Sequence, residues 1–180
     1  MKRYFPLLII LFFSNYMFGQ IVQLGNEYIG FGKFIIGESI TKYNVIPAKG
    51  GKYTKDNHEF NIYAYADSVS IQEIEFNAKL MTFNDSNRLV EFVFIKFYKK
   101  NGNRKYEKEA EMDYKKLIDY LTRELNNKGE SKKYKNTYNP KIIYNEQVWN
   151  FQNISIQLKK TRTDYNASFD FSIKYLGHSL

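Results

Sequence analysis

The sequence predicts an α+β fold, with one long amphipathic helix packed on one face of an antiparallel β-sheet of about five to seven strands. Runs rich in β-branched and aromatic residues lie on both sides of a single segment with helical spacing, and short polar turns separate neighbouring runs. Strands that precede and follow one helix are typical of α+β proteins, whereas alternating βαβ winding requires several helices.

The composition is that of one globular domain. Of 180 residues, 43% are hydrophobic and 26% are charged, with only three prolines and ten glycines, which is too apolar for a disordered chain. The chain has no cysteine, and this excludes thiol catalysis, cysteine-ligated metal centres and lipid attachment through cysteine. We therefore expect a single domain over residues 20–180 that is not a lipoprotein.

Residues 1–19 have the pattern of a cleaved secretory signal peptide. Lys2 and Arg3 precede an apolar run at positions 4–13, and Gly19 supplies a small residue at the expected cleavage site. The run is much shorter than the ~20 residues of a spanning helix, so we expect no stable membrane span after cleavage. The signal peptide ends at Gly19-Gln20, and the chain is rich in Lys, Asn, Ile and Tyr. In both respects it resembles exported proteins of AT-rich Gram-negative bacteria. We therefore expect a periplasmic or extracellular protein.

The helix is predicted over residues 107–128. Its apolar residues recur at helical spacing and form one stripe, which comprises Ala110, Tyr114, Leu117, Ile118, Leu121 and Leu125. Gly129 follows at the place where a left-handed C-terminal cap belongs. The stripe is expected to pack on the sheet.

A hairpin is predicted before the helix, with strands at 71–83 and 88–98 joined by a polar turn at 84–87. If Phe83 pairs with Arg88, alternation along the strands sorts the side chains into two faces. The face expected under the helix carries Ile74, Phe76, Ala78, Leu80, Glu91, Val93, Ile95 and Phe97. Phe92 and Phe94 point to the opposite face.

Further strands are predicted at 60–65, 142–151, 154–160 and 168–176, with a short helical turn at 39–44. The last strand alternates cleanly, with Phe169, Phe171 and Ile173 on one side and polar residues on the other, as in a half-exposed antiparallel strand. Residues 131–140 are expected to form a link.

That link is basic and contains Lys132, Lys133, Tyr134 and Lys135. Basic residues interleaved with aromatic ones can bind nucleic acid, but an exported protein is not expected to meet it. An acidic envelope polymer or an acidic protein patch is the expected target of such a cluster. A solvated loop kept soluble by lysine is the alternative.

Little in the sequence points to catalysis. His58 and His178 lack metal-ligand spacing, and no glycine-rich phosphate loop or nucleophile motif occurs. We therefore expect no metal and no cofactor. Glu91 is the one carboxylate on an otherwise apolar strand face, and such a setting raises the pKa of a carboxyl group. It makes a carboxylate-dependent carbohydrate hydrolase the enzymatic alternative.

Sixteen Tyr, fifteen Phe and one Trp exceed what a single helix on a sheet requires. We expect Phe92, Phe94, Trp149 and Phe151 to lie exposed and to contact a partner, because aromatic residues are enriched at binding surfaces. The alternative is that residues 21–46 fold across these rings and cover them.

The preferred interpretation is an exported, non-enzymatic binding module that recognises a protein partner in the bacterial envelope or the medium. Its aromatic residues and the lysine-rich segment with Lys132, Lys133, Tyr134 and Lys135 would form the contact. In size and expected location it resembles inhibitor and toxin-immunity proteins of the bacterial envelope. A carbohydrate hydrolase and a structural envelope protein that binds acidic polymer remain the alternatives.

Overall fold

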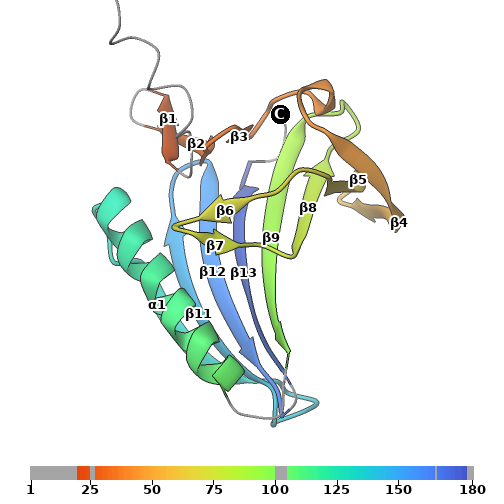
Figure 1. Cartoon of the computed structure of the whole chain (residues 1–180). Coiled ribbons are helices and arrows are strands. Elements are labelled where there is room, and N and C mark those ends of the chain that lie inside the picture. Colours follow the sequence, from red (N-terminus) through yellow and green to blue (C-terminus); the bar gives the residue numbers. More distant parts are fainter. Residues whose placement is uncertain (1–19, 25–26, 100–104, 165, 178–180) are drawn as a thin grey trace, which may run out of the picture.

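The computed structural model describes residues 20–24, 27–99, 105–164 and 166–177. The predicted signal peptide at 1–19 and His178 lie outside the described residues. Within them, the fold class is confirmed: one long helix packs on an antiparallel sheet (Figure 1). The described chain contains no helix that is both long and apolar enough to cross a membrane.

The main sheet has eight strands, one more than the upper end of the predicted range, and all neighbours are antiparallel. In spatial order they are β10 (Glu130–Lys135), β11 (Ile143–Asn150), β12 (Ile154–Arg162), β13 (Asn166–Tyr175), β9 (Leu89–Lys99), β8 (Ala78–Phe83), β5 (His58–Tyr65) and β4 (Val45–Lys55).

Two small sheets accompany it. One consists of β1 (Ile21–Leu24), β2 (Glu27–Phe31) and β3 (Phe34–Ile35), and the other of β6 (Ser70–Ile71) and β7 (Ile74–Glu75). A short 3₁₀ turn over Ile40–Lys42 confirms the helical turn predicted there.

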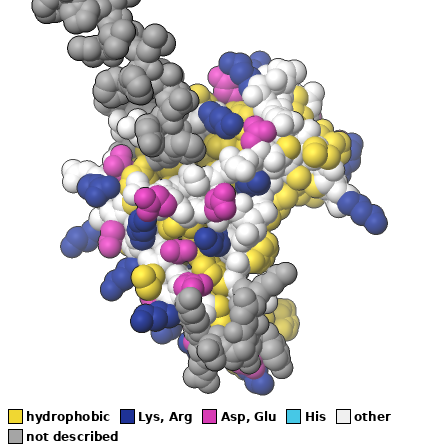
Figure 2. Space-filling view, viewed as in Figure 1, with side chains coloured by type: hydrophobic (Ala, Val, Ile, Leu, Met, Phe, Trp, Pro, Cys, Tyr) yellow, Lys and Arg dark blue, Asp and Glu magenta, His cyan; other side chains and the backbone are white. Residues whose placement is uncertain are grey.

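The helix α1 spans Lys105–Glu124 and lies across β9, β12 and β13 (Figure 1). The stripe predicted from the sequence faces the sheet, and Ala110, Leu117 and Leu121 are fully buried. Charged side chains of both signs cover the outer side of the helix (Figure 2). The helix ends earlier than predicted, because Asn126 adopts a positive φ of 46° and turns the chain. Gly129 also has a positive φ of 65°, but it lies five residues beyond the helix end.

The helix covers the face opposite to the predicted one, so the expectation that Ala78, Leu80, Val93 and Ile95 lie beneath it was wrong. Strand β9 pairs with β13, and this pairing sets Phe92 beside Ile173 and Phe94 beside Phe171. The C-terminal strand has only one apolar face, and the helix packs on that face. Phe92 and Phe94 lie on the same face and are therefore buried. We call this the helix face and the other the open face.

The predicted hairpin register also needs correction. Ala78 pairs with Ile95 and Met81 with Phe92, while Phe83 pairs with Leu89 rather than with Arg88. The ladder shifts between Thr82 and Phe83, because a bulge adds one residue to β9 there. The pairing between β8 and β9 therefore moves by two positions, which leaves the side chains of these two strands grouped as predicted. The predicted strand 71–83 is interrupted between β7 and β8, however, and Phe76 packs against Phe94 rather than sharing a face with Ala78.

The predicted link at 131–140 begins with a strand. Residues 130–135 form β10, the edge of the main sheet beside β11, and all six residues are exposed. A polar, lysine-rich segment lacks the apolar alternation that marks a half-buried strand, and lysine is common on exposed sheet edges.

Candidate functional site on the open face of the sheet

The aromatic residues predicted to bind a partner lie in the core. Phe92, Phe94 and Trp149 are fully buried, and Phe151 is half-buried and packs against the core. The Phe34 ring centroid lies 5.4 Å from that of Phe92 and 4.9 Å from that of Phe94. The expectation that these rings are exposed was wrong. The alternative in which residues 21–46 fold across them describes Phe92 and Phe94.

Three parts of the chain share this covering. Phe31 lies 5.1 Å from Phe171, and Phe76, which follows β7, lies 5.7 Å from both Phe94 and Phe169. The β1–β3 sheet, the β6–β7 hairpin and α1 therefore all lie on the helix face (Figure 1). Their combined cover accounts for the high aromatic content.

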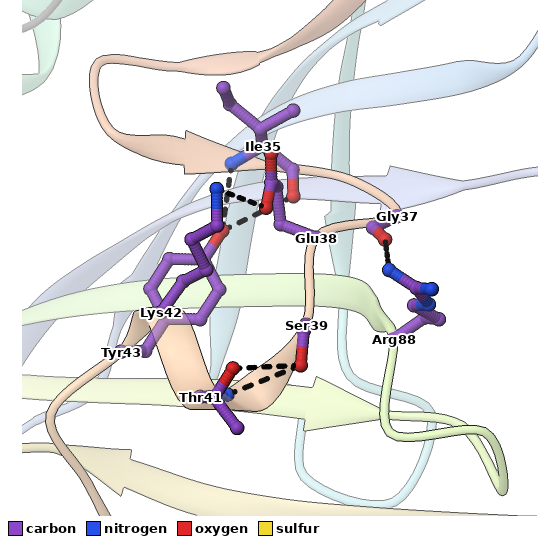
Figure 3. A network of polar contacts seen from close by, with 8 residues as sticks. All are labelled: Ile35, Gly37, Glu38, Ser39, Thr41, Lys42, Tyr43 and Arg88. Atoms are coloured by element: carbon purple, nitrogen blue, oxygen red, sulfur yellow. Dashed lines mark hydrogen bonds and ion pairs between the residues drawn. The ribbon is translucent and has the colours of Figure 1, made fainter.

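A network of polar contacts joins residues 21–46, which we call the leading segment, to the β8–β9 turn (Figure 3). The Gly37 N–H donates to the Leu89 carbonyl at 2.8 Å, and the Arg88 guanidinium donates to the Gly37 carbonyl at 3.4 Å. The Tyr43 hydroxyl donates to the Ile35 carbonyl at 3.2 Å. Burial raises the pKa of Tyr43 to about 12, so this hydroxyl remains a donor at neutral pH.

Trp149 is held inside by its indole N–H, which donates to the Asn127 carbonyl at 2.8 Å. Gly129 passes so close that a Cβ there would lie 2.8 Å from the Trp149 Nε1 atom. The single tryptophan therefore anchors the chain after the helix to β11, and it presents no surface to a partner.

The lysine cluster is exposed, as predicted, but strand alternation divides it. Lys133 and its pairing neighbour Asn145 line a groove on the helix face. Lys132 points the other way and pairs with Glu130 at 3.7 Å. The Tyr134 ring lies beside that of Tyr144, with centroids 5.0 Å apart and planes inclined at 39°. The predicted cluster is thus two separate surfaces.

On the open face, apolar side chains form a patch across β4, β5, β8 and β9. Pairing aligns Ile46, Ala64, Leu80 and Val93 in one row across the four strands. The full patch, which we call the open-face patch, comprises Ile46, Ile62, Ala64, Ala78, Leu80, Val93, Ile95 and Phe97. Ile46 is 58% exposed and Phe97 is 51% exposed, while the other six are half-buried.

Polar side chains dominate the open face of β12 and β13. They include Ser155, Gln157 and Lys159 on β12 and Ser168, Asp170, Ser172 and Lys174 on β13. Burial raises the pKa of Asp170, and the neighbouring Lys159 partly opposes this shift. The open face therefore has an apolar half and a polar, charged half that meet between β9 and β13.

A pocket of about 450 Å³ lies at one end of this face, beside Glu91. The Glu91 side chain is 23% exposed and lies 4.0 Å from the Lys174 ammonium. Burial raises the pKa of Glu91, and Lys174 and Lys55 oppose the shift. The sequence-based expectation of a raised pKa is therefore confirmed, although Glu91 lies on the open face and not beneath the helix.

Other polar and aromatic groups line the same pocket. The His58 Nδ1 atom lies 3.6 Å from the Asp85 carboxylate, and Asp56 adds another carboxyl group. Tyr53 and Phe60 stack at the wall with centroids 5.0 Å apart. Such a lining can hold a polar ligand against aromatic rings. No group of three or more His, Cys, Asp or Glu side chains in the described chain is placed to hold a metal ion.

Sequence reasoning grouped Val93, Ile95 and Phe97 correctly but placed them under the helix. One signal could have corrected this: strand 168–176 has a single apolar face, and its neighbour in the sheet must bury the matching side. No sequence pattern pointed to Ile46, because β4 was not predicted. The pairing of β4 is irregular between Pro47 and Lys52, which explains why its sequence lacks strand alternation.

Comparisons with known proteins do not assign the chain to a family. No protein-family model matches the chain, and no curated protein and no solved structure matches it at a significant level. The class that the coordinates define is an α+β protein with a single helix on one face of an eight-stranded antiparallel sheet.

Proposed function

We propose that this protein is an exported, non-enzymatic binding module that recognises a protein partner in the bacterial envelope, in the manner of an inhibitor or immunity protein. The observation that carries the proposal is the open-face patch, in which the exposed Phe97 and Ile46 flank half-buried aliphatic side chains. Contiguous apolar surface of this kind, bordered by polar residues, is typical of protein interaction sites.

Within the described residues, the elements that pack on the main sheet leave this patch open. The helix, the β6–β7 hairpin and the β1–β3 sheet all contact the helix face. A second flat apolar surface, such as the sheet face or helix of another protein, can therefore reach Phe97 and Ile46 directly. The adjoining polar half supplies Lys159, Asp170 and Lys174 for charge pairing at the rim.

A binding role without chemistry fits the groups that the patch presents. Its eight side chains are aliphatic or aromatic, so they can bury area but cannot transfer protons or act as nucleophiles. The large exposed residues sit at opposite ends of the patch, on β4 and β9, with the half-buried ones between them. A partner that contacts both of them would cover a broad surface rather than enter a cleft.

A capture experiment tests the proposal. Purified protein is cross-linked in envelope extracts, and the captured partners are compared with those of a double variant, Ile46→Ser with Phe97→Ser. The control is Met112→Ser with Tyr138→Ser, which removes two exposed apolar side chains elsewhere. We expect the patch variant to lose a partner that the wild type and the control both retain.

Three outcomes would contradict the proposal. They are capture of no partner by the wild type, retention of every partner by the patch variant, and self-association through the patch. Sedimentation of wild type and patch variant detects the last, since a second copy on this face would dissociate when Ile46 and Phe97 are replaced.

A second candidate function is a carbohydrate hydrolase that uses Glu91. It is favoured by the raised pKa of Glu91 in a pocket that also holds Asp56 and Asp85, since glycoside hydrolysis uses one protonated and one ionised carboxyl group. Turnover of envelope glycans that disappears in Glu91→Gln and persists in the exposed-carboxylate variant Glu73→Gln would support it. Absence of turnover in the wild type would remove it.

A further inference from the structure

A groove of about 530 Å³ lies on the helix face, between the first half of α1 and the strands β10, β11 and β12. It is separate from the open-face patch, because it lies on the other side of the sheet. The side chains that line it and can donate hydrogen bonds are Lys108, Lys133, Asn145, Lys160 and Arg162. Glu107 and Glu111 supply the two carboxylates of the lining. Four cations against two carboxylates leave a formal charge of +2.

The strand register brings these cations together. Lys133, Asn145 and Lys160 form one row across β10, β11 and β12, so their side chains emerge on the same face as near neighbours. Lys135 and Arg162 flank Ile143 in the adjacent row. Residues far apart in the sequence therefore present four positive groups to one strip of the sheet.

Lys160 forms the floor of the groove. Its side chain is only 10% exposed, its ammonium pairs with the Glu111 carboxylate, and it lies 4.9 Å above the Tyr114 ring. An ammonium group has three N–H donors, and within the described residues Glu111 is its one hydrogen-bond partner. A nearly buried cation in the lining of the groove thus retains donor capacity.

The cations around it lack compensation. Among the residues that the structure describes, Lys108, Lys133, Lys135 and Arg162 form no ion pair with a carboxylate. Lys133 and Lys135 on β10, and Lys160 and Arg162 on β12, lie two positions apart on the same face of the sheet, so their like charges repel one another. A bound anion would remove that repulsion, so binding at this place is coupled to the stability of the fold.

We propose that this groove binds a phosphate group, free or as a phosphate monoester. A monoester carries about −1.5 to −2 charges at neutral pH, which matches the excess of positive charge, whereas a carboxylate brings only one. The guanidinium of Arg162 can donate two parallel hydrogen bonds to phosphate oxygens, and Lys133, Lys160 and Asn145 add single donors. The site goes beyond the proposed protein-binding function and does not depend on it.

The test is a titration of purified protein with inorganic phosphate and with glycerol 3-phosphate, followed by NMR chemical shifts at constant ionic strength. Saturable shifts are expected at the groove, together with a rise in melting temperature relative to chloride. Tighter binding of glycerol 3-phosphate assigns the groove to organic monoesters, and tighter binding of inorganic phosphate assigns it to the free anion.

A matched pair of variants separates a site from general attraction. Lys133→Ala and Lys132→Ala remove the same charge from adjacent, exposed positions of β10, but only Lys133 lines the groove. Lys133→Ala and Arg162→Ala are each expected to weaken binding roughly tenfold, with Lys132→Ala unchanged.

Equal losses in Lys132→Ala and Lys133→Ala would overturn the proposal, since they would show non-specific attraction to a basic protein. Absence of saturable binding by the wild type would overturn it as well. So would galacturonate binding as tightly as the phosphates, because the groove would then select no dianion. Lys133 and Arg162 are exposed, so both variants are expected to fold.

Discussion

The Phe34 ring packs edge-on against Phe94, with centroids 4.9 Å apart and planes inclined at 67°. Phe34 also contacts Tyr65 and Phe92, so one residue of the leading segment joins strands β5 and β9. These contacts bury the rings of Phe92 and Phe94 in the core, whereas strand alternation alone does not decide whether they are buried or exposed. They also make the leading segment a structural part of the domain.

Replacing Phe34 should therefore destabilise the whole domain. Phe34→Ala removes a buried ring that meets four other aromatic rings, and a deletion of this kind costs about 3–5 kcal/mol. Urea denaturation followed by circular dichroism measures the loss. Tyr138→Ala, at a position 97% exposed, should change stability by less than about 0.5 kcal/mol. Equal stability of the two variants would show that the leading segment does not support the core.

Glu91 should make the protein less stable as the pH rises. Burial raises its pKa above the ordinary value of 4.5, so the folded state holds a proton that the unfolded state has already lost. The free energy of unfolding therefore falls as the pH rises from 4.5 through the raised pKa. Glu91→Gln should be more stable than the wild type above this window and equally stable below pH 4.5.

Chemical denaturation of wild type and Glu91→Gln at a series of pH values measures the difference. Glu73→Gln removes the same charge from an exposed carboxylate and should not reproduce the effect. A constant difference between Glu91→Gln and the wild type at every pH would contradict the prediction.

Gly129 and Gly50 provide a pair of tests for backbone crowding. Both have positive φ, 65° and 70°, but a Cβ at Gly50 meets nothing within 4 Å, whereas at Gly129 it meets Trp149. Gly50→Ala should cost about 1–2 kcal/mol from the left-handed conformation alone. Gly129→Ala should cost more and should shift the emission of Trp149 to longer wavelength. Equal costs with unchanged emission would show that the contact with Trp149 is relieved freely.

The protein should unfold steeply in alkali. Burial raises the pKa of both Tyr43 and Tyr120 to about 12, and it also raises the pKa of Tyr65, Tyr98 and Tyr114. The unfolded state loses these protons near pH 10 while the folded state keeps them, so stability falls as the pH rises above 10. Phenolate absorbance should therefore rise together with the loss of circular dichroism. Complete tyrosine titration with the fold retained would contradict this.

The sequence was informative where one side of an element is apolar. Leu117 and Leu121 marked the buried stripe of the helix, and Phe169 and Phe171 marked the buried side of β13. In both elements the opposite side is polar, so periodicity alone identifies the covered face. The hairpin strands and the 3₁₀ turn were located for similar local reasons.

Strand β9 shows where local pattern stops being sufficient. Phe92 and Phe94 on one side and Val93 and Ile95 on the other are all apolar, so alternation separates the two groups but does not say which is buried. That choice depends on pairing with β13, a partner more than 65 positions away in the chain. The open-face patch was consequently missed.

The candidate sites divide in the same way. Glu91 was identified because its charge contrasts with its neighbours in the sequence. The groove beside Lys133 was not, because it requires Lys160 and Arg162 from another strand and the register of β10, a strand whose sequence lacks any apolar rhythm.

The exposed border formed by β10 also affects how copies of the protein meet. Its outer backbone groups are open to a further strand, the arrangement from which ribbons and fibrils grow. Two such borders placed side by side would confront Lys132, Lys133 and Lys135 of each copy with those of the other, and their mutual repulsion opposes this growth. Acetylating these amines would remove that repulsion and would therefore favour strand pairing between copies along β10.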